Sequence, residues 1–512
     1  MLAKLKNMLS RRYKTSALFA GALSALVFPP VYLWQLFMLM LLGMWVLCNK
    51  LNSYKQAAAL GYFYGLGFFA AGFYWVGNAL LIDITTFGWL YPITLAASGA
   101  FFGLFMILPF IMWRFGNGVV GKVTGFATAW VLMEWLRSFL LTGFPWNMLG
   151  TAWAFHPVFI QTASLWGTYG LSFVMLIWCG SLYGYICGQS NKYGAAFILI
   201  PVLLLGFGAW RISNYPQFNS DITVRLVQPA IPQQMKWNRK SLEDNFYQYV
   251  NMSAESGLEN VDFVVWGETA MPFSLDYDNI YRQEILQAVP PRGYLITGAL
   301  RQGDEHDGYN YFNSLFVLNK FGDVKGFYDK HHLVPFGEYV PLRRFLPAWV
   351  RPVANAVADF GVGKQYKNIK LEKMPAFGAL ICYEIIFPDE VIDRNNQPQW
   401  LVVLTNDGWY GNSSGPYQHL VAAQMRAVEE GIAIVRSANS GISAIINPMG
   451  EIIKEIPLGK RGIADVKLPY HSKVSTIYGH VGGGLINALM LLILGILLIY
   501  KRLPDYGASK NS

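Results

Sequence analysis

Apolar residues along this 512-residue chain gather into runs of membrane-spanning length, separated by short connections. A helix needs roughly 17–25 mainly apolar residues to cross a hydrocarbon core about 30 Å thick. The pattern predicts about eight spans, of which the first two are short enough to form a hairpin closed by Pro29 and Pro30. The runs lie near residues 16–31, 34–49, 57–80, 89–113, 119–140, 159–187, 194–211 and 482–500.

Charge supports a membrane protein and predicts its orientation. Only 14% of the residues are charged, against about 25% in soluble proteins. Lys or Arg follows the second, fourth and sixth runs (Lys50, Arg114 and Lys192), whereas the connections after the first, third and fifth carry neither. Because cytoplasmic loops are the ones enriched in Lys and Arg, we expect both termini in the cytoplasm and residues 212–480 outside it. The net charge of +9 forms no basic stripe, so no nucleic-acid partner is expected.

Two charged residues, Glu134 and Arg137, interrupt the fifth run one helical turn apart. The simpler interpretation is a pair whose charges neutralise each other near the membrane interface. Ionisable residues inside a span are often functional, so the alternative is a role in gripping a lipid head group.

From about residue 220 the pattern changes to short β-rich runs punctuated by Gly, Pro and Asn. Alternating strands and helices predict an α/β domain with a mostly buried sheet. Strands are expected at Ile222–Gln228, Val261–Trp266, Tyr294–Leu300, Ser314–Leu318, Ala376–Ile381, Leu401–Leu404, Ile432–Arg436, Ser443–Ile446 and Glu451–Ile456. Helices are expected at Leu242–Met252, Phe387–Asp393 and Tyr417–Gly431.

Three polar residues, Glu268, Lys330 and Cys382, stand where strands of this domain should end. Strand ends in α/β sheets are where catalytic groups gather, and the combination of these residue types suits covalent catalysis. A carboxylate can deprotonate a thiol, and an ammonium favours the thiolate and stabilises an oxyanion. His331 and His332 adjoin Lys330, so a Cys–His pairing is the alternative.

Cys382 is the only cysteine of the polar block, so it should remain a free thiol. The spacing of the four cysteines matches no metal-binding pattern, and the glycines at 482–484 follow no predicted strand and so form no phosphate loop. We therefore expect neither a metal nor another cofactor.

Four stretches around these residues resemble the signatures of the nitrilase superfamily, and more narrowly those of the bacterial apolipoprotein N-acyltransferases. They read WGETAMPF (266–273), YDKHHLVPFGEYVPLR (328–343), ICYEIIFP (381–388) and TNDGWYGNSSGPYQHL (405–420). One departure is Gly267, where this family more commonly has Pro. The resemblance covers the whole chain, including the arrangement of seven spans, an external domain and one final span.

The resemblance implies acyl transfer in two steps. Cys382 would take an acyl chain from a phospholipid as a thioester and release a lysophospholipid. The chain would then pass to the α-amino group of the diacylglyceryl-cysteine at the N-terminus of an apolipoprotein. By the same match, Glu268 is the general base, Lys330 stabilises the oxyanion and Glu338 is a second glutamate that orients the site. The match also assigns supporting or lining positions to Tyr383, Glu384 and Trp237.

The resemblance further implies an α-β-β-α sandwich on the periplasmic face of a bacterial inner membrane. The expected division is a helical membrane domain at 1–214, the nitrilase-like domain at 215–478, and a final helix with a cytoplasmic tail at 479–512. Trp146 and Trp349 lie in aromatic-rich external segments, which are typical either of interface anchoring or of contact with membrane lipids and lipid substrates.

Two other functions fit parts of the pattern. A membrane-anchored amidase would use the same three residues to hydrolyse a small amide, although such an enzyme needs no spans. A transporter or receptor whose external domain only binds a ligand would not need Cys382.

Overall fold

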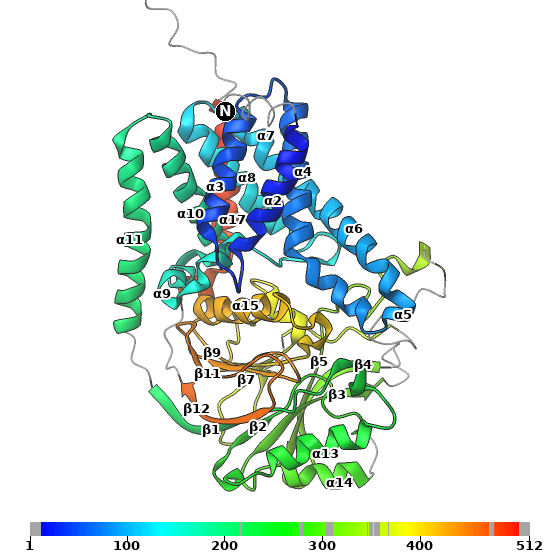
Figure 1. Cartoon of the computed structure of the whole chain (residues 1–512). Coiled ribbons are helices and arrows are strands. Elements are labelled where there is room, and N and C mark those ends of the chain that lie inside the picture. Colours follow the sequence, from blue (N-terminus) through cyan, green and yellow to red (C-terminus); the bar gives the residue numbers. More distant parts are fainter. Residues whose placement is uncertain are drawn as a thin grey trace, which may run out of the picture. The chain divides into compact units, whose positions relative to one another are not determined.

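The computed structural model describes residues 12–214, 218–273, 275, 280–303, 311–345, 347, 352, 359–366, 368–470 and 476–500. The chain divides into two compact units, which are coloured along the sequence in Figure 1. We call them the helical unit (Met1–Gly77, Trp89–Ile212 and Val481–Ser512) and the α/β unit (Asn78–Gly88 and Ser213–His480). The segment Asn78–Gly88 thus packs with the α/β unit although it lies among the apolar runs in the sequence.

The helical unit has a helix within every predicted apolar run. Its main helices are α2 (Tyr13–Ser24), α3 (Trp34–Cys48), α4 (Tyr54–Gly72), α6 (Tyr91–Gly103), α7 (Ile107–Phe115), α8 (Gly118–Arg137), α10 (Ala163–Ile186), α11 (Asn191–Ser213) and α17 (Gly484–Tyr500). The short helices α5 (Ile84–Phe87) and α9 (Pro157–Ile160) lie in connections.

Within the described part of the chain, three helical stretches are long and apolar enough to cross a membrane, namely Ile84–Phe115, Ala163–Ile186 and Asn191–Ser213. A fourth results if α4 and the 3-10 helix Tyr74–Leu81, which meet at a bend of 45°, form one span. Helices such as α2 and α3, with 12 and 15 residues, are short for a span. The described residues therefore contain three or four helices of spanning type, and the number eight stays a prediction.

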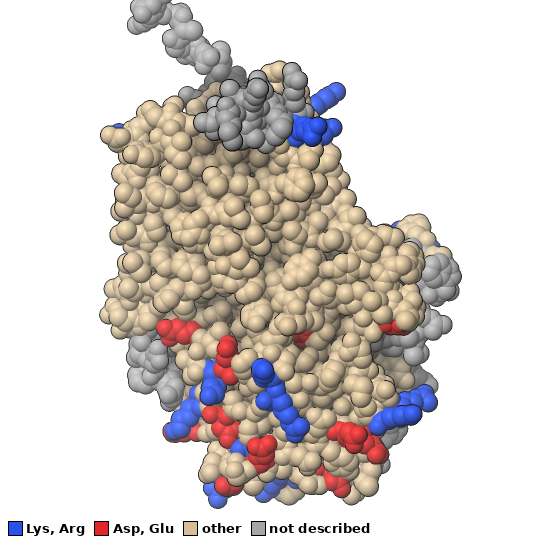
Figure 2. All heavy atoms as spheres, viewed as in Figure 1, with Lys and Arg blue, Asp and Glu red and all other residues tan. Residues whose placement is uncertain are grey.

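Figure 2 shows that the visible surface of the helical unit is almost entirely uncharged, with Lys and Arg side chains near one end. Inside the unit, glycines allow helices to pack closely: a Cβ on Gly21 would lie 1.9 Å from the carbonyl oxygen of Tyr64, across the contact between α2 and α4. Such small-residue contacts are typical of helices that associate in lipid.

Glu134 and Arg137 on α8 are both buried and close enough for their opposite charges to attract each other, although no salt bridge joins them among the described residues. Glu134 accepts hydrogen bonds from the Leu149 amide (2.7 Å) and the Trp130 indole (3.0 Å). Arg137 donates to the carbonyls of Phe144 and Trp146, at 3.1 and 3.0 Å. Both charges thus fix the loop that follows α8.

The α/β unit is built on two six-stranded sheets (Figure 1). The first has the order β12-β1-β2-β3-β4-β5 and the second β11-β10-β9-β8-β7-β6. In each sheet three adjacent strands run parallel, β1-β2-β3 in one and β7-β8-β9 in the other. The strands are β1 (Phe218–Gln228), β2 (Phe263–Val265), β3 (Tyr294–Gln302), β4 (Tyr311–Asn319), β5 (Val324–Asp329), β6 (Asn368–Ile369), β7 (Phe377–Ile381), β8 (Trp400–Thr405), β9 (Ala433–Ala438), β10 (Ser443–Ile446), β11 (Ile452–Ile456) and β12 (Gly462–Tyr470).

The core lies between the two sheets, where Leu226 and Val265 of one sheet and Val402 and Leu404 of the other belong to a single buried apolar cluster. A second cluster joins the outer face of the first sheet to α13 (Leu242–Ser253), and α15 (Gly415–Glu430) packs on β9 and β10 of the second. The unit is therefore an α-β-β-α sandwich. Its remaining helices are α12 (Gln233–Lys236), α14 (Ile280–Glu284) and α16 (Ile477–Val481).

The helix expected at Phe387–Asp393 is absent, which makes that prediction wrong. A 3-10 helix occupies Cys382–Ile386 instead, and the chain then continues without a helix. Pro388 lacks a backbone donor, and Asp389 has φ of 71°, outside the helical region. The apolar spacing there reflects burial of Ile385, Phe387 and Val391 by the fold rather than a helical face.

Gly298 on β3 lets the turn after β2 pack against the sheet. A Cβ there would lie 2.4 Å from the backbone nitrogen of Thr269 and 2.8 Å from the Cα of Glu268. Overpacking of this kind destabilises a fold by about 1–3 kcal/mol. We therefore expect G298A to lower the melting temperature of the full-length protein in detergent by several degrees.

The control for this substitution is G462A on β12, where the nearest neighbour of a new Cβ is a side-chain carbon 3.4 Å away. G462A should melt within about 2 °C of the unmodified protein, as surface changes of up to about 0.5 kcal/mol do. Equal melting temperatures for the two variants would contradict close packing at Gly298.

Candidate active site

The topology of the two sheets brings the three predicted residues to one edge. β5 runs in the same direction as β2 and β3 because two antiparallel pairings separate it from β3, so Glu268 and Lys330 follow strands that end at the same edge. The second sheet meets this edge, since the Glu268 amide donates to the carbonyl of Thr405 at 3.4 Å. Thr405 ends β8, and Cys382 follows the adjacent end of β7.

Lys330 is the centre of a buried cluster of charges and is itself 1% exposed. Its Nζ lies 2.9 Å from Oε2 of Glu338 and 3.6 Å from Oε1 of Glu268. Asn313 joins the same two carboxylates, because its Nδ2 donates to Oε1 of Glu268 at 2.8 Å and to Oε1 of Glu338 at 2.9 Å. One ammonium and one amide thus hold two glutamates side by side.

Cys382 begins the turn after β7 and is 5% exposed. Its φ of 54° lies in the left-handed region, which residues other than glycine rarely adopt. Such backbone strain is often found at functional sites. His419 of α15 supports this turn, because its Nε2 donates to the Cys382 carbonyl at 3.0 Å. Its Nδ1 lies 2.8 Å from Asp407, which also binds Arg436 at 2.6 Å, and all three side chains are fully buried.

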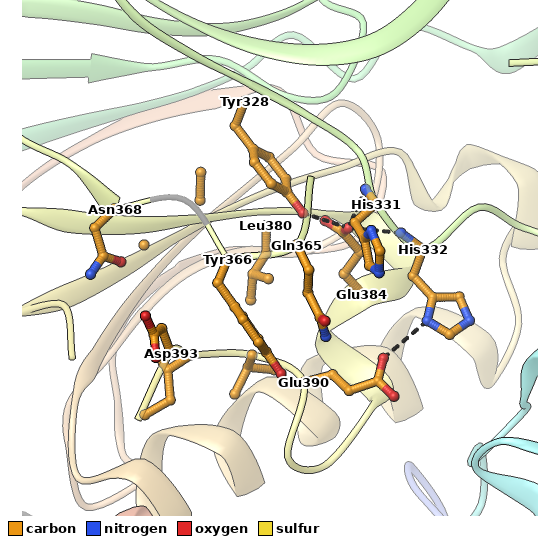
Figure 3. Close-up of a pocket in the computed structure, with 14 residues that line it drawn as sticks. Tyr328, His331, His332, Gln365, Tyr366, Asn368, Leu380, Glu384, Glu390 and Asp393 are labelled. Carbon is orange, nitrogen blue, oxygen red and sulfur yellow. Dashed lines mark hydrogen bonds and ion pairs between the residues drawn. The ribbon is translucent and has the colours of Figure 1, made fainter. Parts of the chain in front are cut away.

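Glu384 ties the end of β5 to the end of β7. Its Oε1 accepts from the Tyr328 hydroxyl (2.7 Å) and from the amides of His331 and His332 (2.8 and 3.1 Å), while Oε2 accepts from the Ile381 amide (2.6 Å). Figure 3 shows the donors from Tyr328, His331 and His332 around the carboxylate at one side of a pocket. Glu384, a predicted support position, therefore binds the backbone just after Lys330 and the backbone just before Cys382.

The histidines of the alternative mechanism have other partners. His331 Nδ1 lies 2.8 Å from the Gly363 carbonyl, and His332 Nδ1 lies 3.1 Å from Glu390, toward which its ring points in Figure 3. The ring of His332 also stacks on Phe387, with centroids 3.8 Å apart. The geometry therefore favours Glu268 over a histidine as the base.

Burial makes the thiol a weak acid, whereas two neighbouring glutamates keep the lysine a permanent cation. Burial raises the pKa of Cys382 to about 12, Glu268 and Asp407 add to the rise, and Lys330 opposes it. Burial alone would lower the pKa of Lys330, but Glu338 and Glu268 outweigh it and hold that pKa well above its usual range. At neutral pH the resting site therefore holds a thiol and an ammonium, and a base must remove the thiol proton as attack occurs.

The other predicted residues are distributed differently. Tyr383 is buried beside Cys382 in sequence, with its ring edge-on to Phe387. Trp237 is 41% exposed directly after α12. Trp146 is 3% exposed in the helical unit, where its ring packs on Trp75 with centroids 4.5 Å apart, and its substrate contact stays a prediction. Trp349 lies outside the described residues.

Sequence reasoning missed Asn313, His419 and Lys236, whose side chains contact the site. Asn313 lies inside β4 beside another buried polar residue, Ser314, and no feature of the sequence distinguished it from the rest of the strand. His419 lies on a buried helix face within the quoted stretch 405–420. Lys236 adjoins Trp237, and its Nζ donates to the carbonyl of Glu268 at 2.8 Å.

A buried thiol beside a carboxylate–ammonium cluster, at the edge of an α-β-β-α sandwich, defines an enzyme of the nitrilase type. The carbon-nitrogen hydrolase family model matches residues 223–477, and the model of the apolipoprotein N-acyltransferase N-terminal domain matches residues 20–181. The chain belongs to the apolipoprotein N-acyltransferase family, as its full-length relatives show.

An apolipoprotein N-acyltransferase of Rhodopseudomonas palustris is 35% identical over 95% of both chains. One of Rickettsia typhi is 34% identical over 95% of this chain and 98% of the relative. Among solved structures, an amidase from Nesterenkonia sp. is 17% identical with a TM-score of 0.37, covering 49% of this chain and 92% of the amidase. With its apolar helices and bacterial relatives, the chain is an acyltransferase-family membrane protein of bacteria.

The bridging role of Asn313 is testable with N313D, which replaces a donor to two carboxylates by a third negative charge. The added charge should raise the pKa of Cys382 further and slow its alkylation by iodoacetamide at pH 7 by at least about tenfold. Peptide mass spectrometry measures the rate at Cys382 alone. N319D, on the same strand and in a surface turn, is the control and should react at the unmodified rate. Equal rates for N313D and N319D would refute the bridging role.

Proposed function

We propose that this protein transfers a fatty acyl chain from a phospholipid, through a thioester on Cys382, to the α-amino group of a diacylglyceryl-cysteine at the N-terminus of an apolipoprotein. The observation that carries the proposal is the cluster of Glu268, Lys330 and Cys382 in a chain that also holds spanning-type helices. A lipid donor and a lipidated acceptor would both reach such a site from the membrane.

In the first half-reaction, Glu268 takes the proton of the Cys382 thiol as sulfur attacks the ester carbonyl carbon of the phospholipid. The Lys330 ammonium offsets the negative charge of the tetrahedral intermediate. The carbon–oxygen bond to the glycerol then breaks, and the leaving lysophospholipid takes the proton from Glu268. Cys382 keeps the acyl chain as a thioester, and the base returns to its carboxylate form.

In the second half-reaction, the neutral amine of the acceptor attacks the thioester carbonyl. Glu268 takes a proton from the nitrogen, the carbon–sulfur bond breaks, and the sulfur leaves as a thiolate that recovers a proton from Glu268. The product is an amide, and no water is consumed. An amidase would take its acyl group from an amide, with an amine as leaving group, and would use water at this step, so the fate of the acyl group separates the two functions.

For the surroundings of the site, we propose about eight spans, with the α/β unit on the periplasmic face of the inner membrane and both termini in the cytoplasm. The alternation of Lys and Arg between the apolar runs supports this orientation. Glu338, Tyr383 and Glu384 support the site in this proposal, Trp237 lines it, and Trp146 and Trp349 contact lipid substrate.

The thioester is directly observable. Full-length protein incubated with phospholipid should gain the mass of a fatty acyl group on the peptide that contains Cys382, and a diacylglyceryl-cysteine peptide should discharge it. C382S should show no such thioester, whereas C187S, at an exposed cysteine of the helical unit, should retain it. An acyl chain recovered only as free fatty acid would indicate an amidase-like hydrolase, and absence of any thioester in the unmodified protein would indicate a binding protein.

Removal of the base is tested by E268Q, which keeps the shape of the side chain and its bond from Asn313 but cannot accept a proton. Acylation of Cys382 should fall by a factor of about 100 or more, as is typical when a general base is lost. E259Q, at an exposed position, is the matched control. An E268Q protein that acylates at the control rate would move the base role to Glu338 or His332.

A further inference from the structure

Lys236 is a buried lysine that the proposed mechanism does not use. It ends α12 and is 5% exposed, whereas Lys240, four residues later, is exposed. Its Nζ donates to the backbone carbonyl of Glu268 at 2.8 Å. A buried ammonium is unfavourable unless it is hydrogen-bonded and near negative charge, so its position beside the base calls for an explanation in terms of the site.

The segment that carries Lys236 is fixed by side chains from the edge where the site lies. Asn439, after β9, donates to the Ile231 carbonyl at 2.9 Å and accepts from the Ile231 amide at 3.2 Å. Asn406, after β8, donates to the Gln233 side chain at 3.0 Å. Because β8 pairs with the nucleophile strand β7 and β9 pairs with β8, these bonds fix the Lys236 ammonium relative to Cys382 as well as to Glu268.

The charges of the site are unequal without Lys236. Glu268 and Glu338 carry two negative charges and Lys330 only one positive charge, so a thiolate on Cys382 would form beside an uncompensated carboxylate. A second ammonium makes the resting cluster neutral. We propose that Lys236 is the second cation of this site: it holds the backbone of the base and offsets the second carboxylate, so that the Cys382 thiolate forms more readily.

Lys236 is thus a positioning residue. Its importance for acyl transfer rests on the proposed function, but its effect on the ionisation of the Cys382 thiol is independent of that function. The titratable groups that act on its ammonium are Glu268, after β2, and Cys382, after β7. Burial lowers the pKa of Lys236 to about 8, and these two groups oppose the fall. The second cation is therefore present at neutral pH and is lost as the pH rises through about 8.

The test is the pH profile of Cys382 alkylation by iodoacetamide in the full-length protein in detergent, followed by peptide mass spectrometry. The logarithm of the rate should rise with pH as the thiol ionises, with a shoulder near pH 8 where Lys236 loses its proton. K236M should react at least about tenfold more slowly at pH 7, without a shoulder. K236R, which keeps its charge at all these pH values, should restore the rate and also lack the shoulder. K240M is the control and should match the unmodified profile.

A K236M profile identical to that of K240M would overturn the proposal. If K236M both reacts slowly and melts at a lower temperature, K236R decides, because a folded K236R that is as slow as K236M would show that the charge has no effect. If neither variant folds, the unmodified protein decides: a shoulder near pH 8 supports the proposal and a straight line overturns it. Iodoacetamide alkylation requires no lipid, so it can be measured even if the protein transfers no acyl chain. Conversely, a profile without the shoulder would overturn the role of Lys236 but not the proposed acyl transfer.

Discussion

The site depends on the Lys330 ammonium, which lies between two glutamates that could not be buried together without it. Taking a charge out of water costs several kcal/mol, and two carboxylates that share one amide donor also repel each other. The positive charge of Lys330 offsets both the cost of burying the carboxylates and the repulsion between them. Lys330 itself is held at the end of β5, because its backbone amide donates to the Asn313 carbonyl. The same ammonium therefore holds Glu268, which follows β2, close to Glu338, which follows β5.

The nucleophile is held on both sides of a strained residue. Glu384 binds the amide before Cys382, and His419 binds the carbonyl of Cys382 itself. A left-handed conformation at a residue with a side chain persists only when its surroundings enforce it. The His419–Asp407–Arg436 group supplies this enforcement from α15 and β9, so the helix that covers the second sheet also takes part in positioning the thiol. The strain and the buried charges are thus parts of one rigid arrangement.

The α/β fold and the three central residues of the site could be predicted from the sequence. Glu268 and Cys382 stand out because each follows an apolar run of strand length, and Lys330 because it follows the short strand at 324–329. Asn313 and His419 were missed because a polar residue inside a run has no positional signature, and only the three-dimensional pairing shows that Asn313 faces two carboxylates. The helix expected at 387–393 failed because tertiary burial imitated a helical pattern. The expected pairing of Glu134 and Arg137 omitted the backbone groups of the following loop, which also bind each charge.

The short segment Asn78–Gly88 has a consequence for how this protein can be divided. Its Asn78 side chain donates to the Tyr410 carbonyl at 2.8 Å, so the α/β unit is completed by residues that precede the rest of it by more than a hundred positions. The chain therefore passes between the two units at four points rather than at the two ends of one insertion. A fragment that begins at residue 213 and ends at 480 would not be the complete α/β unit. It would lack the segment that contacts the 405–420 stretch. The catalytic part of the protein is therefore not one continuous segment of the sequence.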